Sequence, residues 1–226
     1  MQKFAIFALA GAFLGQEAFA NHIESMLTLE DFELATIQAE SLVETEAMDT
    51  LRCGEQFKRF ATEQPNFAEL LQAEGKWTDP EFDEQQAMQG QGNYIWKRMS
   101  DEFPESKGYS LWGANGINFD EINQGSLGNC WTLSAMQTIA EYPERLQELF
   151  ANPYINDKGV YAVNMYALGI PITVVIDDYI PFHKSYPDYP KFGRPDEGKG
   201  LWPVILEKAI AKYFGFYNAI VAGQPA

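Results

Sequence analysis

The residues best suited to chemistry lie in the stretch 124–131, where two glycines precede a single cysteine, Cys130. The pattern predicts a tight glycine-rich turn that delivers Cys130 to the first turn of a buried helix, with Asn129 as a side-chain N-cap. A thiol at a helix start feels the positive end of the helix dipole, which favours the nucleophilic thiolate. The helix is predicted from apolar residues that recur on one face at helical spacing, namely Leu133, Met136, Ile139 and Ala140.

Two alternatives for Cys130 involve no catalysis. A free cysteine at the start of a buried helix is often a small apolar core residue. A disulfide with Cys53, the only other cysteine, is the second alternative. The glutamine, the two glycines and the tryptophan that flank Cys130 in register favour the nucleophile, whose chemistry requires no cofactor.

The stretch Gln-Gly-Ser-Leu-Gly-Asn-Cys-Trp resembles the signature of the calpain family of papain-like cysteine proteases, Gln-Gly-x-Leu-Gly-Asp-Cys-Trp, and departs from it only at Asn129. The resemblance implies that Cys130 is the catalytic nucleophile. It also implies that Gln124 and the Cys130 backbone N–H donate to the oxyanion. Attack on an amide builds negative charge on oxygen, and a fixed donor aimed there is worth about 2.7–4 kcal/mol.

Four further segments are similar to calpain motifs and follow the family's order along the chain. The resemblance implies a calpain-type catalytic domain over residues 76–226. Its expected fold is the mainly helical N-terminal half of a papain-like α+β cysteine protease, with a small β-hairpin and a helical N-terminal extension. The segments that carry the similarity are 77–82, 96–98, 174–181 and 202–217.

Residue patterns alone predict a hairpin in the second half of the chain. Two strand-like runs, 159–168 and 172–180, are separated by a Gly-Ile-Pro turn signal. A short helix is predicted before them over 144–150. Asp177 and Asp178 are adjacent on a strand and point to opposite faces, so we expect a structural role rather than a paired acid and base.

A longer helix is predicted over 202–214, where apolar residues form a buried stripe. Gly215 is a suitable C-terminal stop. Lys208 and Lys212 favour the C-terminal end of the helix.

A papain-like protease also needs a histidine to move the thiol proton and an asparagine to orient the imidazole. The chain has two histidines, His22 near the N-terminus and His183, which is predicted to be a surface-loop residue. The family's histidine and asparagine lie in a β-rich half downstream of the helix over 202–214. We therefore expect a domain truncated before its His/Asn half, inactive alone, with a second subdomain or chain supplying both residues.

The sequence is then either a fragment of a full protease or a natural half-domain. The expected function is that of a calpain-like cysteine endopeptidase acting on protein or peptide substrates. The alternative is a non-catalytic calpain-like module that binds partner proteins. A third possibility is an inhibitor built around the acidic N-terminal helices.

The resemblance implies one ion, calcium, which would act as a regulator. In calcium-regulated calpains two loops supply oxygen ligands, which suit a hard cation. Gly116, through its carbonyl, and Glu121 fall at matching places in the first loop. Gly200 stands where the family has an acidic ligand and Phe119 where it has a basic residue, so calcium control is an open expectation. The alternative is that Glu121 is an ordinary exposed carboxylate.

The N-terminal region differs in character from the rest. Residues 1–20 resemble a secretory signal peptide, with Lys3 before an uncharged apolar run and a small-residue cleavage site, although a buried N-terminal helix is the alternative. Residues 21–75 carry twelve acidic and three basic residues and are predicted to form an acidic helical pro- or accessory region. The expected location is the secretory pathway, as a secreted or lysosome-like protein, with the cytoplasm as the alternative.

The overall composition sets limits on function. Hydrophobic residues make up 46% of the 226 residues, which is enough for a sizeable core. The net charge of −16 argues against nucleic-acid binding, because phosphate contacts need a basic face. No stretch has the length and apolarity expected of a transmembrane segment.

Overall fold

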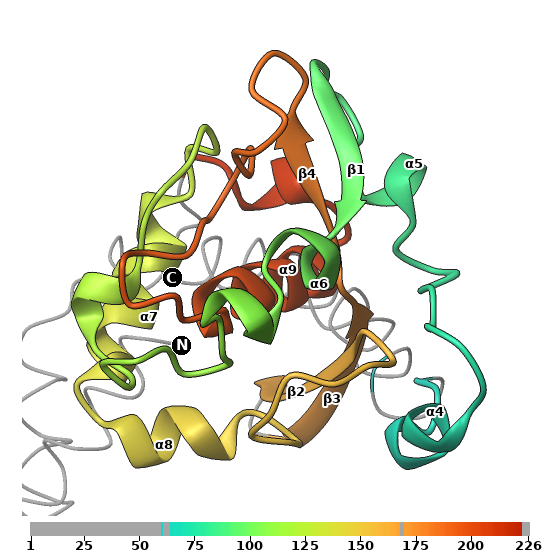
Figure 1. Ribbon diagram of the computed structural model, residues 1–226, viewed down its shortest axis with the longest axis vertical. Coiled ribbons are helices and arrows are strands. Elements are labelled where there is room, and N and C mark those ends of the chain that lie inside the picture. The colour runs from blue at the N-terminus through green and yellow to red at the C-terminus, as the bar shows by residue number, and fades with distance from the viewer. Residues whose placement is uncertain (1–59, 61–63, 168–169, 223–226) are drawn as a thin grey trace, which may run out of the picture. The chain divides into compact units, whose positions relative to one another are not determined.

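The computed structural model describes residue 60, residues 64–167 and residues 170–222. These residues belong to one compact unit (Figure 1). The predicted signal peptide and most of the acidic region 21–75 lie outside the described residues. Among the described residues, no helix combines the length and the apolar character needed to cross a membrane.

Helices and two small sheets together confirm the predicted α+β class. The described helices are α4 (Phe67–Gln72), α5 (Glu84–Ala87), α6 (Met99–Glu102), α7 (Cys130–Ala140), α8 (Pro143–Glu148) and α9 (Trp202–Phe214), with 3-10 turns η1 (Glu105–Lys107), η2 (Phe119–Glu121) and η3 (Tyr217–Ile220). The strands are β1 (Tyr94–Arg98), β2 (Val160–Ala167), β3 (Ile170–Asp177) and β4 (Tyr179–His183).

The predicted hairpin is confirmed as the antiparallel pair β2–β3, in which Val160 faces Asp177 across the ladder. The second predicted run divides in two, because the chain changes partner at Asp178. Beyond that residue β4 pairs antiparallel with β1, so that Arg98 faces Tyr179. His183 therefore ends a strand rather than lying in a loop, which corrects the sequence prediction.

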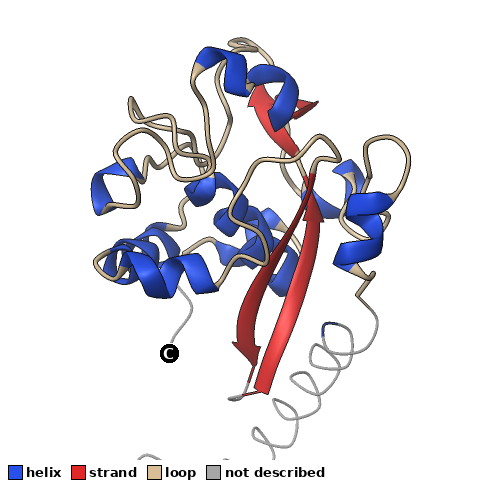
Figure 2. Ribbon diagram, turned by 60° about the horizontal axis from the view of Figure 1, so that its bottom comes forward, coloured by secondary structure: helices blue, strands red, loops and turns tan. Residues whose placement is uncertain are grey.

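The hairpin buries both of its faces, as the alternation of strand side chains requires. Figure 2 shows its two long strands side by side, with helices on either side. One face joins the main core with α7, α8 and α9, and the other packs against α4 and Trp77. The residues on the first face include Tyr161, Val163, Val174 and Ile176, and those on the second are Val160, Ala162 and Val175.

Helix α4 lies in the described part of the predicted N-terminal helical region. Asn66 caps it by accepting from the backbone N–H groups of Ala68 and Glu69. Phe67 and Leu70 then pack on the hairpin. This part of the region is therefore attached to the domain through apolar contacts.

Helix α9 has the bounds that the sequence predicted and passes through the centre of the unit (Figure 1). Gly215 ends it with a φ of 106°, a conformation that favours glycine. Lys208 and Lys212 are 1% and 0% exposed, so they do not serve as solvated charges near the helix end. Their ammonium groups pair with buried carboxylates instead.

Candidate active site

Cys130 is the first residue of α7, as predicted, and its thiol is free and exposed. The disulfide and core-residue alternatives therefore do not describe this cysteine. The helix behind it is anchored by the predicted apolar face, since Leu133, Met136 and Ala140 are buried in the main core. Cys130 thus stands at the solvent-facing start of a helix whose other end is fixed by packing.

Asn129 occupies the N-cap position, but its side chain makes no capping hydrogen bond. The prediction of a side-chain N-cap is therefore wrong. The side chain turns inward, and its Nδ2 donates to Glu207 Oε1 at 2.7 Å, where both residues are buried. The Asn129 carbonyl still begins the helix by accepting from the Thr132 N–H at 3.0 Å.

The turn before Cys130 lies tightly against the segment that follows β4. A Cβ placed on Gly125 would lie 2.0 Å from the Phe192 carbonyl oxygen, so only glycine fits there. Ser126 donates both its backbone N–H and its hydroxyl to the Lys191 carbonyl, at 2.9 and 2.8 Å. Close backbone contact therefore determines the path of the turn.

Gln124 lies in the same turn with an exposed side chain. Its amide nitrogen donates to the Leu127 carbonyl at 2.7 Å, which orients the amide. An amide nitrogen carries two N–H donors, so one remains for another acceptor. The Gln124 amide is therefore held in a fixed orientation and keeps one N–H for another acceptor.

Trp131 fixes the other side of the helix start. Its indole N–H donates to the Ile220 carbonyl at 2.8 Å, and its ring lies edge-on to Phe214 with centroids 5.9 Å apart. The Ala222 N–H also donates to the Gly128 carbonyl at 3.0 Å. Contacts from the end of α9 and from η3 therefore hold the residues on both sides of Cys130.

A network of buried charges connects α9 to the two sheets. Lys212 donates to Asp79 Oδ2 and to the Val175 carbonyl, both at 2.7 Å, and Lys208 pairs with Asp177. All four of these ionic side chains are at most 1% exposed. The network fixes the helix that carries Glu207 relative to the hairpin.

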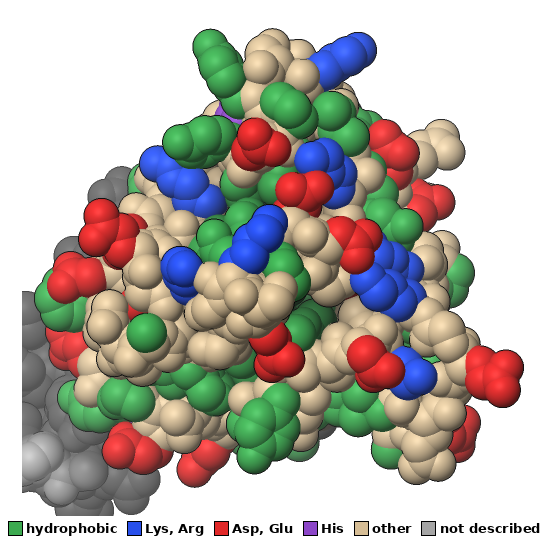
Figure 3. All heavy atoms as spheres, in the orientation of Figure 1, with side chains coloured by type: hydrophobic (Ala, Val, Ile, Leu, Met, Phe, Trp, Pro, Cys, Tyr) green, Lys and Arg blue, Asp and Glu red, His purple; other side chains and the backbone are tan. Residues whose placement is uncertain are grey.

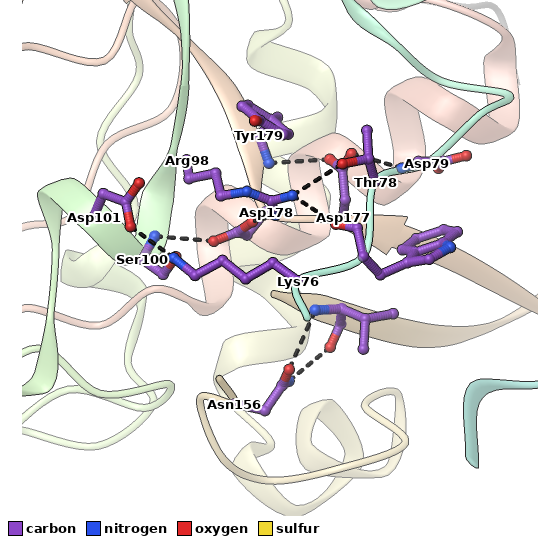
Figure 4. A network of polar contacts seen from close by, with 12 residues as sticks. Lys76, Thr78, Asp79, Arg98, Ser100, Asp101, Asn156, Asp177, Asp178 and Tyr179 are labelled. Carbon is purple, nitrogen blue, oxygen red and sulfur yellow. Dashed lines mark hydrogen bonds and ion pairs between the residues drawn. The ribbon is translucent and has the colours of Figure 1, made fainter. Parts of the chain in front are cut away.

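The two adjacent aspartates have the structural roles that the sequence predicted. Asp177 accepts from the backbone N–H of Asp79 at 2.8 Å, while Asp178 pairs with Arg98. Arg98 also donates to the Trp77 carbonyl at 2.8 Å (Figure 4). Each aspartate therefore holds a different neighbouring segment, in agreement with their opposite directions on the strand.

Glu121 is 2% exposed, so the alternative of an ordinary exposed carboxylate is wrong. Its Oε2 is buried without a hydrogen-bond partner. The backbone of Gly198 lies against the carboxylate, since an added Cβ would stand 1.9 Å from Oε1. Burial raises the pKa of Glu121, and the nearby charge of Asp196 raises it further, while interactions with Gly200 and Asn115 oppose the rise.

Among the described residues, no hydrogen bond connects Cys130 with the other positions that the sequence predicted. Gly116 adopts a φ of 71°, as glycine readily does, in the loop before η2. The backbone N–H of His183 on β4 donates to the Tyr189 carbonyl at 2.9 Å, and His22 lies outside the described residues. Within the described chain, no group of three or more His, Cys, Asp or Glu side chains converges as a metal site would require.

Sequence reasoning missed Glu207, which lies beneath the helix start and is 2% exposed. The sequence feature that could have indicated a buried role for Glu207 is that it is an acidic residue on an otherwise apolar helix face. Burial raises its pKa, while the hydrogen bonds from Asn129 and from the Gly193 N–H lower it.

On the visible face of the molecule, acidic and basic side chains are interspersed (Figure 3).

The structure therefore places an exposed cysteine at a helix start, after a turn held by backbone contacts that also carries an oriented glutamine. A family model described as "Calpain family cysteine protease" matches residues 76–226. The chain belongs to the calpain family of cysteine proteases, and this membership supports a papain-like α+β fold.

Individual relatives show how much of a calpain the chain represents. A stretch of 107 residues, 47% of the chain, is 39% identical to calpain-type cysteine protease DEK1 of Zea mays and covers 5% of that protein. Calpain-8 of Rattus norvegicus is 30% identical over 133 residues, covering 58% of this chain and 18% of the relative. Calpain-5 of Caenorhabditis elegans is 28% identical over 139 residues, 58% of this chain and 20% of the relative.

Proposed function

We propose that this chain carries the nucleophile of a calpain-type cysteine endopeptidase. Cys130 would attack the substrate amide, and Gln124 with the Cys130 backbone N–H would stabilise the oxyanion. The observation that carries the proposal is the exposed, free thiol at the first residue of α7, behind a turn braced by backbone contacts.

The first experiment measures the reactivity of Cys130 in the full chain. Iodoacetamide alkylation at about pH 6 is followed at each cysteine by peptide mass spectrometry, and the matched control is the same cysteine in the urea-unfolded chain. We expect folded Cys130 to react on the order of tenfold faster than unfolded Cys130. A folded thiol that reacts no faster than the unfolded one would refute the nucleophile and favour the non-catalytic binding module.

We further propose that catalysis needs a histidine and an asparagine from a second subdomain or chain. The support is chemical, because a cysteine protease needs a base that takes the thiol proton. His183 is the last residue of strand β4. The purified chain is expected to give no turnover of a casein-type substrate. Addition of a calpain His/Asn half is expected to produce turnover that Cys130→Ser abolishes, whereas turnover by the chain alone would contradict this proposal.

We also propose that calcium binds this chain as a regulatory ion. Glu121 and the Gly116 carbonyl would supply oxygen ligands to a regulatory ion. The buried Glu121 oxygen without a hydrogen-bond partner fits a hard cation. If the ion binds the folded chain, CaCl2 should raise the melting temperature more than MgCl2 does, and Glu121→Gln should remove the difference. An equal calcium response in the variant would exclude Glu121 as a ligand.

A further inference from the structure

A side-chain hydrogen bond from Asn129 to Glu207 connects α9 to the residue preceding Cys130. Asn129 Nδ2 donates to Glu207 Oε1 at 2.7 Å, and the exposed fractions of the two residues are 0% and 2%. The Asn129 carbonyl begins α7. The position of Asn129 therefore determines where the helix, and with it Cys130, starts.

The second oxygen of Glu207 holds the other wall of the turn. Glu207 Oε2 accepts from the Gly193 N–H at 2.8 Å, and a Cβ on Gly193 would stand 2.8 Å from that oxygen. The preceding residue, Phe192, presents its carbonyl to Gly125. One buried carboxylate thus connects the start of α7 with the segment against which the glycine turn lies.

The donors around Glu207 match a carboxylate without an added proton. Each oxygen receives one N–H, and an ionised carboxylate only accepts hydrogen bonds. Asn129 provides its donor from its own amide. An aspartate at position 129 would have the same shape but no donor, so two carboxyl groups would face each other and one proton would have to be shared between them.

Few other groups act on Glu207. The titratable or charged residues on the elements around it are Tyr217 on η3, Cys130 on α7, Lys191 and Arg194 beside the contact with Gly193, and Lys208, Lys212 and Tyr213 on α9. Among the described residues none of them forms an ion pair with Glu207. Burial, followed by the charge of Glu207, raises the pKa of Tyr217 well above its ordinary value, so the phenol stays neutral near neutral pH.

We propose that Glu207 is a positioning residue for Cys130, and that the amide of Asn129 keeps this positioning independent of a proton shared between two acids. The proposal rests on the proposed role of Cys130 as the nucleophile. It assigns to Asn129 and Glu207 an effect on how the reactivity of Cys130 varies with pH, which packing alone would not produce.

The experiment compares Cys130 alkylation by iodoacetamide in the wild-type full chain, in Asn129→Asp and in the double variant Asn129→Asp with Glu207→Gln. Site-resolved rates are measured from about pH 5 to about pH 9, which brackets the ordinary pKa of a thiol. The double variant exchanges the acid and the amide, so it keeps one donor and one acceptor. Circular dichroism at each pH reports whether the chain stays folded.

The wild-type rate is expected to rise with pH, because the thiolate is the form that attacks iodoacetamide. Asn129→Asp should match it at acidic pH and then fall at least about tenfold below it at the alkaline end, because loss of the shared proton leaves two facing charges. The double variant should return to within about twofold of the wild-type rate, since its amide again supplies the donor.

Two results would overturn the positioning role. One is a profile for Asn129→Asp that coincides with the wild type or that the double variant fails to restore. The other is unfolding of Asn129→Asp, which would show that the pair maintains the whole fold rather than the position of Cys130. The ratio between variants tests this inference, whereas the wild-type rate against the urea-unfolded chain tests the proposed function, so the two failures are distinguishable.

Discussion

Replacement of Lys212 by methionine tests whether the buried charges stabilise the domain. The ammonium lies 2.7 Å from Asp79 Oδ2, and the two side chains are 0% and 1% exposed. Without Lys212, the Asp79 carboxylate remains buried with the Glu81 N–H and no paired cation at that distance. Removal of one partner of a buried pair costs about 3–5 kcal/mol. We expect Lys212→Met to lower the free energy of unfolding by that amount.

The chain offers a matched control in the exposed pair Lys76–Asp101. Its atoms are 2.6 Å apart, but its side chains are 37% and 64% exposed. Exposed pairs contribute about 0–1 kcal/mol, so Lys76→Met should cost no more than that. Urea unfolding followed by circular dichroism measures both variants. If Lys212→Met cost no more than Lys76→Met, burial would not be what gives the pair its effect.

A double-mutant cycle separates the pair from the individual residues. Asp79→Asn alone leaves the Lys212 ammonium buried opposite a neutral amide. Together with Lys212→Met it removes both charges, so the combined loss should be smaller than the sum of the single losses by about 0.5–3 kcal/mol. Strict additivity would contradict a direct interaction.

Two further predictions concern close contacts and pH. Gly198→Ala would place a Cβ 1.9 Å from the Glu121 carboxylate and should destabilise by about 1–3 kcal/mol in urea unfolding, whereas Gly92→Ala, with open space around it, should stay within about 0.5 kcal/mol. Burial raises the pKa of Glu207, so the folded chain holds this proton to higher pH than the unfolded chain and wild-type stability falls as pH rises through that range. Glu207→Gln cannot titrate there, so its unfolding free energy relative to wild type should rise over the same range; a constant difference would contradict the shift.

Local rules predicted the elements that local residues determine. Gly215 marked the end of α9 because few other residues adopt its φ of 106°. The turn signal between two β-branched runs predicted the hairpin, and the apolar face of α7 placed Cys130 at its exposed start. Each of these features depends on residues within a few positions of one another.

The features that sequence reasoning missed depend on distant partners. Asn129 has the side chain of a good N-cap, yet its amide binds a carboxylate 78 residues away. Lys208 and Lys212 favour the C-terminal end of a helix, but their buried carboxylate partners lie 31 and 133 residues away. An exposed Glu121 is one of the two alternatives that the sequence leaves open. Nothing near Glu121 in the sequence indicates that the backbone of Gly198 covers its carboxylate.

The pairing of Asp79 with Lys212 also constrains the order in which the domain can form during synthesis. The two residues are 133 positions apart, so Asp79 leaves the ribosome long before its cation is made. Asp177 likewise waits for Lys208 on the same helix. Because these two buried acids are paired, within the described part of the chain, with lysines of α9, the domain is expected to fold as a unit after that helix has emerged. A nascent chain that stalls before α9 would expose the apolar hairpin and become a target for cellular quality-control proteases.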